Sequence, residues 1–183
     1  MSILNKIKRN IQLEIKDNIF KLADRDGIER ERARKKLVEI GSPAIDFLSE
    51  METHPKAIAR WEAVKTLSEI RDPISAPLLI NALEDKSTGV RWLAAEGLAA
   101  LGKNGMIAVL KALLDFPETL YLRQGAHHVL KRLQDYFDGE EYRIILKTLE
   151  HPDAAAKLPV IIRSYLDNIG YDINSDDYLT KVG

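Results

Sequence analysis

The chain has 183 residues, of which 45% are hydrophobic and 30% charged, with a formal net charge of −1. This balance is typical of a folded protein and excludes long disordered segments. The absence of cysteine excludes disulfides, thiolate nucleophiles and cysteine-ligated zinc, and no apolar run approaches the roughly 18 residues of a membrane span, so we expect a cytoplasmic protein.

The charge is unevenly distributed along the chain. Residues 1–36 carry a net charge of +5, whereas residues 37–183 carry −6. A basic end of this kind is either a solvated helix face or a site for an acidic partner such as nucleic acid. The pI of 6.4 favours the solvated face, so we do not expect nucleic-acid binding.

Residues 1–25 are predicted to form an amphipathic helix. Isoleucines recur at every fourth position, at Ile3, Ile7, Ile11, Ile15 and Ile19. Such a helix can lie on a membrane surface. We expect it instead to cap the open apolar side of the segment that follows.

Four segments then repeat one another at intervals of 30 to 32 residues. Each has an arginine, an alanine three residues later and a leucine four residues after that. The repeated residues are Arg30, Ala33 and Leu37; Arg60, Ala63 and Leu67; Arg91, Ala94 and Leu98; and Arg123, Ala126 and Leu130. The alanine and leucine share one helix face, and a fixed period of this length predicts a solenoid.

A second apolar-periodic segment follows each of these helices, after a turn marked by glycine or proline. Each unit is therefore predicted to be a pair of helices, A and B. The predicted units are residues 26–55, 56–87, 88–119 and 120–153. A C-terminal capping helix over 154–170 and a tail over 171–183 complete a single domain.

These residues resemble a known family. The pattern Val90-Arg91-x-x-Ala94-Ala95-x-x-Leu98-x-x-Leu101-Gly102 is similar to the HEAT repeat, and in particular to the HEAT-like variety of phycobilisome lyases. The resemblance covers about residues 26–153. It implies an all-α, right-handed superhelix with B helices on its concave side, and a role in binding rather than catalysis.

The arginine column of the repeats invites a structural interpretation. In the resembled family this arginine often bonds an acidic residue of a neighbouring turn, and Asp72 and Asp135 are the residues available for that role here. Trp61 and Trp92 share one register and point away from the alanine–leucine stripe. They either pack between successive A helices or form a patch for a partner.

The predicted B helices also carry polar residues that can line a concave groove. Those chosen as candidate partner-binding residues, beside the two tryptophans, are Asn81, Glu84, Lys111, Asp115 and Lys147. Their mixed charges suit a protein or peptide better than a phosphate backbone. A solvated helix surface is the alternative.

No constellation for catalysis, a cofactor or a metal is recognised. The glycines of Gly97-x-x-x-x-Gly102-Lys103 lie on a helical pattern without a preceding strand, which excludes a phosphate-binding loop. Adjacent His127 and His128 project about 100° apart on a helix and cannot chelate together. His54 and His151 occupy equivalent turns between repeats, each directly before a proline.

The sequence therefore predicts a non-catalytic scaffold or adaptor that binds a protein partner through its concave face. Two alternatives stay open. One is a lyase, or a lyase subunit or chaperone, for phycobiliprotein chromophore attachment; the other is a nucleic-acid-binding HEAT-like protein.

Overall fold

The computed structural model describes residues 3–137 and 139–173, and within them the chain forms ten α-helices and no strand. The helices are α1 (Ile3–Lys21), α2 (Gly27–Ile40), α3 (Ile45–Leu48), α4 (Ala57–Ile70), α5 (Ala76–Ala82), α6 (Thr88–Ala100), α7 (Lys103–Asp115), α8 (Leu120–Leu133), α9 (Glu140–Leu149) and α10 (Ala154–Asn168). The predicted all-α class is confirmed. No helix of the described part is both long and apolar enough to cross a membrane.

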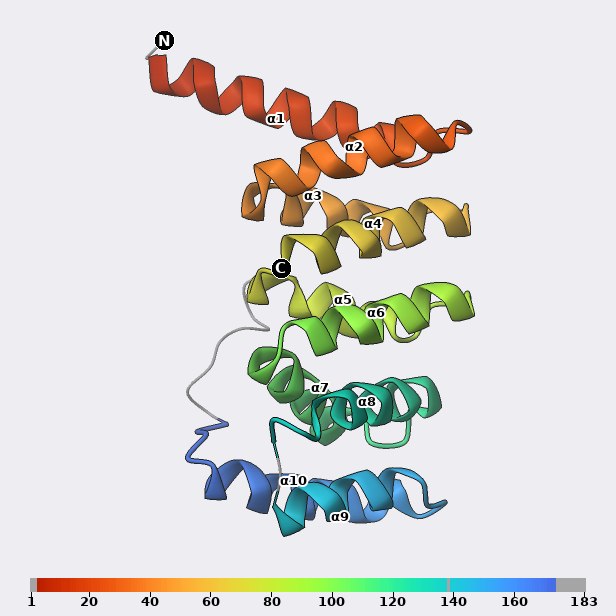
Figure 1. The fold of residues 1–183 in the computed structure, drawn as a ribbon, viewed down its shortest axis with the longest axis vertical. Coiled ribbons are helices and arrows are strands. Elements are labelled where there is room, and N and C mark those ends of the chain that lie inside the picture. Colours follow the sequence, from red (N-terminus) through yellow and green to blue (C-terminus); the bar gives the residue numbers. More distant parts are fainter. Residues whose placement is uncertain (1–2, 138, 174–183) are drawn as a thin grey trace.

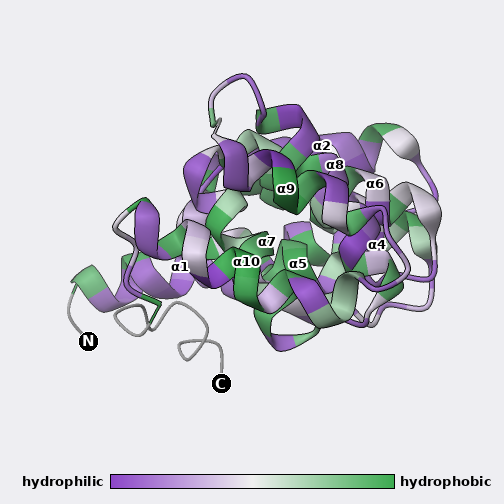
Figure 2. Cartoon of the chain, turned by 90° about the horizontal axis from the view of Figure 1, so that it is seen from below, coloured by the Kyte–Doolittle hydropathy of each residue, from purple (hydrophilic) through white to green (hydrophobic). Residues whose placement is uncertain are grey.

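The helices stack in two layers along one axis (Figure 1). Helices α2, α4, α6 and α8 follow one another in the layer that we call the A layer, where each packs on the next. Helices α3, α5 and α7 form the B layer behind them, and α5 packs on α7. Viewed along the stack, the apolar residues of the two layers face each other (Figure 2). This is the predicted solenoid, while its right-handed sense stays a prediction.

The alanine and leucine columns form the interior between the layers. All eight of these side chains are buried: Ala33, Leu37, Ala63, Leu67, Ala94, Leu98, Ala126 and Leu130. The small alanine lets the next helix approach closely. Because each pair buries its apolar face only against its neighbours, the fold is stabilised by successive interfaces rather than by one central core.

Residues with positive φ follow three of the A helices, α2, α4 and α6. Gly41 and Gly102 have φ of 74° and 59°, a region that glycine enters without steric cost. Arg71 fills the same role after α4 with φ of 57°. Asp72 then caps the following turn, since its carboxylate accepts a hydrogen bond from the Ile74 amide at 2.9 Å. The chain reverses sharply at these points and enters the B layer.

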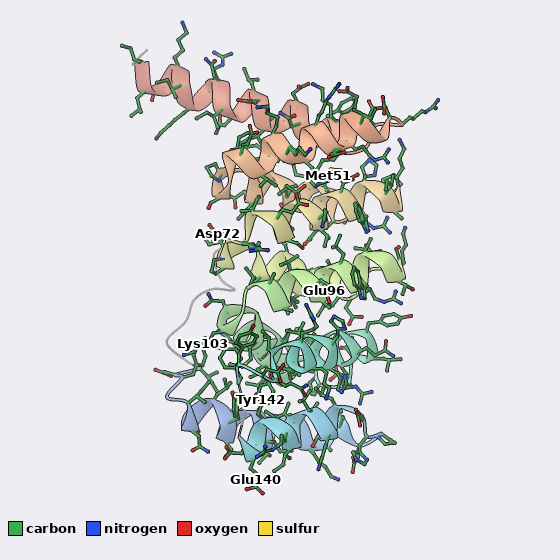
Figure 3. All side chains as sticks on the ribbon, in the orientation of Figure 1. Met51, Asp72, Glu96, Lys103, Glu140 and Tyr142 are labelled. Atoms are coloured by element: carbon green, nitrogen blue, oxygen red, sulfur yellow. The ribbon has the colours of Figure 1, made fainter. Side chains whose placement is uncertain are left out.

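The C-terminal end departs from the expected pairing of α8 with α9. Helix α9 lies beside α8, on the side of α2, α4 and α6, whereas α10 packs against α7 in the B layer (Figure 2). Tyr142 of α9 lies within this end of the stack (Figure 3), where its hydroxyl donates to the Leu130 carbonyl at 2.7 Å. Its ring centre is 5.7 Å from that of Tyr165 in α10. The last A/B pair is therefore α9 with α10.

Helix α1 covers the other end only in part. Ile15 and Ile19 are buried, and this half of α1 packs on α2 and α3. The first half extends beyond the stack (Figure 1), and Ile3, Ile7 and Ile11 are exposed there. The capping role expected for the whole stretch is thus carried by its second half.

Candidate partner-binding site

Three of the five candidate B-helix residues border a groove between α5 and α7. Asn81 of α5 and Lys111 and Asp115 of α7 border this groove, which has a volume of about 220 Å³. Lys111 and Asp115 are four residues apart, so they share one face of α7. The structure thus brings together three of the five polar residues that the sequence singled out.

The walls of the groove are mainly apolar. They are formed by Pro73, Ala76, Pro77, Ile80, Ile107, Ala108, Ala112, Phe116 and Tyr171, and Asn104 adds a further amide. An apolar floor with a few polar groups at its border is the usual make-up of a binding pocket in a protein.

Two residues that line the groove, Phe116 and Tyr171, were not predicted from the sequence. Phe116 is 59% exposed and lies just past the end of α7, where φ and ψ leave the helical region. Tyr171 follows the end of α10 and packs against the core. The spacing of a helix cannot place either residue, because both lie beyond a helix end. The sequence feature that could have indicated Phe116 is the aromatic residue directly before Pro117, at the end of a helical pattern.

Glu84 and Lys147 lie away from this groove. Glu84 borders a neighbouring pocket of about 430 Å³ with Glu52, Arg60 and Asp85. Lys147 is on α9, which belongs to the A layer, so it does not share a face with α5 and α7. These two residues therefore do not border the groove between α5 and α7, and for Lys147 the reason is the position of α9 in the A layer.

The two tryptophans have different surroundings. Trp61 is half-buried and packs against the core, beside Gly89. Trp92 is 57% exposed on α6. The two residues share one register in the repeat, but only Trp92 is largely exposed to solvent.

The arginine column is structural in the first three repeats. Arg60 is 3% exposed and binds both carboxylate oxygens of Asp85, at 2.6 and 2.9 Å. Arg30 donates to Glu62 at 3.2 Å. The acidic partners are therefore Asp85 and Glu62, and not Asp72, which accepts a hydrogen bond from Ser42.

The basic N-terminal region offers few unpaired cations on α2. Lys35 and Lys36 form ion pairs with Glu31 and Glu39 of the same helix, at 2.8 and 2.7 Å. Arg34 bridges to Glu62 of α4 at 2.5 Å. Since these cations are already paired within the chain, α2 is a poor surface for phosphate groups.

Comparison with protein families matches HEAT repeats over residues 17–85 and 46–131, which is more than half of the chain. The chain belongs to the HEAT repeat family. This confirms the resemblance at the level of the family, while the finer resemblance to the phycobilisome-lyase variety stays a prediction.

Three curated proteins are similar to part of the chain. The deoxyhypusine hydroxylases of Aspergillus fumigatus and Neosartorya fischeri are each 37% identical to the chain over 75 residues, and that of Aspergillus clavatus is 36% identical. Each match covers 40% of this chain but only 22% of the hydroxylase. Residues 3–137 and 139–173 hold no group of three or more His, Asp or Glu side chains that could bind a metal.

Proposed function

We propose that this HEAT repeat array is a non-catalytic adaptor that binds an extended segment of a partner protein in the groove between α5 and α7. The observation that carries the proposal is the apolar groove bordered by Asn81, Lys111 and Asp115. Repeat arrays of this type provide long surfaces on which neighbouring units each contribute contacts. We also propose that the B layer lies on the concave side of the array.

The chemistry of the groove suggests what such a segment contains. Its floor, with Ile80, Ile107 and Ala108, suits small or medium apolar side chains. At its border, Lys111 and Asp115 place opposite charges on consecutive turns of α7. A segment with apolar residues flanked by polar or charged ones satisfies both features, and the main chain of the ligand can hydrogen-bond to Asn81 and Asn104.

Selection from a random dodecapeptide library tests this proposal. Peptides selected on the wild-type protein are expected to bind Ile107→Asp about tenfold more weakly or worse, because a charge would then lie on the apolar floor. Asp115→Lys, at an exposed position, reverses the border charge without touching the interior. It is expected to change which peptides are selected.

The matched control is Ile144→Asp, an exposed isoleucine of α9 that does not border the groove. Circular dichroism of each variant establishes that it is folded. Equal binding of the selected peptides to wild type, Ile107→Asp and Asp115→Lys would place the binding surface elsewhere and overturn the proposal.

A second candidate function comes from the shared stretch with the deoxyhypusine hydroxylases. If the chain takes part in that reaction, a protein bearing deoxyhypusine should gain one oxygen atom when incubated with it in the presence of dioxygen and a two-electron reductant, the second oxygen atom leaving as water. Mass spectrometry of that protein decides the matter. No gain of oxygen, together with selective peptide binding at the groove, favours the adaptor.

A further inference from the structure

Three arginines of the repeat column bind the backbone in the same way. Nη1 of Arg60 donates to the carbonyl of His54, six residues earlier, at 2.7 Å. Arg91 donates to the Asp85 carbonyl at 2.7 Å, and Arg30 to the Asp24 carbonyl at 3.0 Å. Each thereby satisfies a carbonyl in the turn that precedes its own helix.

Each of these arginines also has a side-chain partner. Arg60 holds the Asp85 carboxylate and Arg30 contacts Glu62. Arg91 stacks on the Tyr121 ring, with its guanidinium carbon 4.0 Å from the ring centre. A guanidinium has five donors in a planar fork, so a carboxylate such as Asp85 satisfies two of them at once.

Arg123 of the fourth repeat differs from the other three. Its Nε is buried, and no acceptor within residues 3–137 and 139–173 is in hydrogen-bond reach of it. A buried donor without a partner costs free energy, so each such group in a folded protein calls for an explanation. The residues around Arg123 supply one.

His151, in the turn after α9, lines the same pocket as Arg123. His54 lies six residues before Arg60 and Asp85 six residues before Arg91, so the two are equivalent. His151 stands before Pro152 as His54 stands before Pro55. The pocket of Arg123 thus contains the His151 imidazole from a nearby turn, whereas Arg60 pairs with the Asp85 carboxylate.

Arg123 and His151 face a common pocket of about 430 Å³ at the start of α8 and the end of α9. The other residues lining this pocket are Leu120, Gln124, His127, Leu149, Glu150 and Pro152. Its one carboxylate, Glu150, contacts the His127 ring nitrogen at 3.1 Å. Arginine, amide and imidazole donors therefore outnumber the acceptors.

We propose that this pocket, the Arg123 pocket, binds the side-chain carboxylate of an aspartate or glutamate on a partner protein. The bound carboxylate lies against the guanidinium of Arg123, as the Asp85 carboxylate lies against that of Arg60. Leu120 and Leu149 line the same pocket and contact the methylene groups next to the carboxylate. This site is separate from the groove between α5 and α7, and it does not depend on the function proposed for that groove.

The charges of the pocket favour a carboxylate over a phosphate. A phosphate group brings nearly two negative charges at neutral pH, and Glu150 lies in the same pocket. A carboxylate brings one charge and matches the planar fork of arginine, as the Arg60–Asp85 pair of this chain shows.

NMR of the Arg123 Nε–Hε group tests the proposal directly. The probes are sodium acetate and a blocked pentapeptide, acetyl-Ala-Ala-Asp-Ala-Ala-amide, at constant pH and ionic strength. We expect a saturable shift with both probes and none with acetamide. Arg123→Gln serves for an independent affinity measurement by calorimetry, in which binding should weaken about tenfold or more. Arg32→Gln, an exposed arginine that pairs with Glu29, is the matched control.

His151→Asp gives a second test that does not depend on loss of the arginine. The introduced carboxylate should pair with Arg123, raise the Tm by about 2–4 °C and prevent the shift caused by acetate. A shift with acetate but not with the pentapeptide would limit the site to small carboxylates and overturn the proposal. A shift with sodium phosphate alone, or with none of the probes, would also overturn it.

Discussion

At the scale of single residues, the pair of Arg60 and Asp85 joins two successive repeats. Burial by itself raises the pKa of the Asp85 carboxyl, but hydrogen bonds from Arg60 and from the Ser87 amide outweigh it and hold the pKa below the ordinary 3.8. The same pairing with Asp85 raises the pKa of Arg60. Both groups are thus charged at neutral pH, and removal of one leaves the other charge buried.

Asp85→Ala is expected to lower the free energy of unfolding by about 3–5 kcal/mol, the usual cost of leaving one member of a buried ion pair alone. Chemical denaturation at pH 7 measures this loss. Glu118→Gln, in the exposed loop after α7, should change stability by less than about 0.5 kcal/mol and serves as the control. A loss for Asp85→Ala no larger than that of the control would contradict the structural role of the pair.

The same pair gives a dependence on pH. Because the pKa of Asp85 is lower in the folded than in the unfolded chain, its contribution is fully present above the unfolded value, near 3.8. It is lost as the pH falls from there through the folded value. The difference in stability between wild type and Asp85→Ala should therefore shrink below about pH 4, which denaturation curves at pH 3, 4 and 7 can follow.

The two tryptophans allow a test of packing at matched positions. Trp61→Ala removes a half-buried ring and should cost about 1.5–3 kcal/mol, less than the 3–5 kcal/mol of a fully buried aromatic residue. Trp92→Ala removes an exposed ring and should change stability by about 0.5 kcal/mol or less. If thermal denaturation showed equal losses of stability for the two variants, the difference in burial between Trp61 and Trp92 would not determine how much each ring stabilises the fold.

At the scale of elements, glycine controls how closely α6 and α7 approach. A Cβ at Gly105 would lie 1.8 Å from the Leu98 carbonyl oxygen, a backbone atom that cannot rotate away. Gly105→Ala should therefore separate the two helices and lower stability by more than about 3 kcal/mol, or prevent folding.

Gly89→Ala is the control for this change, since a Cβ there meets nothing closer than 3.9 Å within the same kind of helix. It should stabilise the protein by about 0.5–1 kcal/mol, because alanine is the better helix former. Thermal melts of both variants measure the contrast. A stable Gly105→Ala protein would mean that α6 and α7 pack less closely than the structure shows.

The first three helix pairs could be predicted from the sequence, but the last pair could not. Arg30, Arg60 and Arg91 mark each A helix, and a glycine or proline turn follows every time. Tyr142, Ile145 and Leu149 likewise show that α9 has an apolar face, but their spacing does not say which neighbour covers it. That depends on the connection after α8, which is long enough for α9 to settle beside α8.

The same limit applies to the binding groove. Asn81, Lys111 and Asp115 were found because helical spacing places them on one face. Phe116 and Tyr171 were not found because each follows a helix end, where periodicity carries no information. The pocket around Arg123 needed the structure for a different reason. The repeated arginines look alike in the sequence, so the pattern does not show which of them pairs with an acidic side chain.

At the scale of the whole molecule, the two ends of the stack are closed differently. The C-terminal pair covers the last A and B helices, and the Tyr165 hydroxyl reaches the Met106 sulfur of α7 at 3.7 Å. Met106 and Leu130 are fully buried as a result. The first half of α1 covers nothing comparable, because Ile3, Ile7 and Ile11 remain exposed.

This asymmetry predicts opposite results for two truncations. Ending the chain after Gln134 removes α9 and α10 and uncovers the apolar sides of α7 and α8, so the product should bind a hydrophobic dye strongly and form aggregates. Removing residues 1–11 deletes an exposed apolar stripe and should leave the Tm within about 2 °C of that of the full chain. Dye fluorescence, size-exclusion chromatography and thermal melts make the comparison.

If the shorter N-terminal deletion proved as damaging as the loss of α9 and α10, the first half of α1 would have to contact the rest of the protein in solution. If the C-terminal deletion stayed soluble and monomeric, α7 and α8 would not depend on the last pair, contrary to a fold in which each unit is completed by its neighbour.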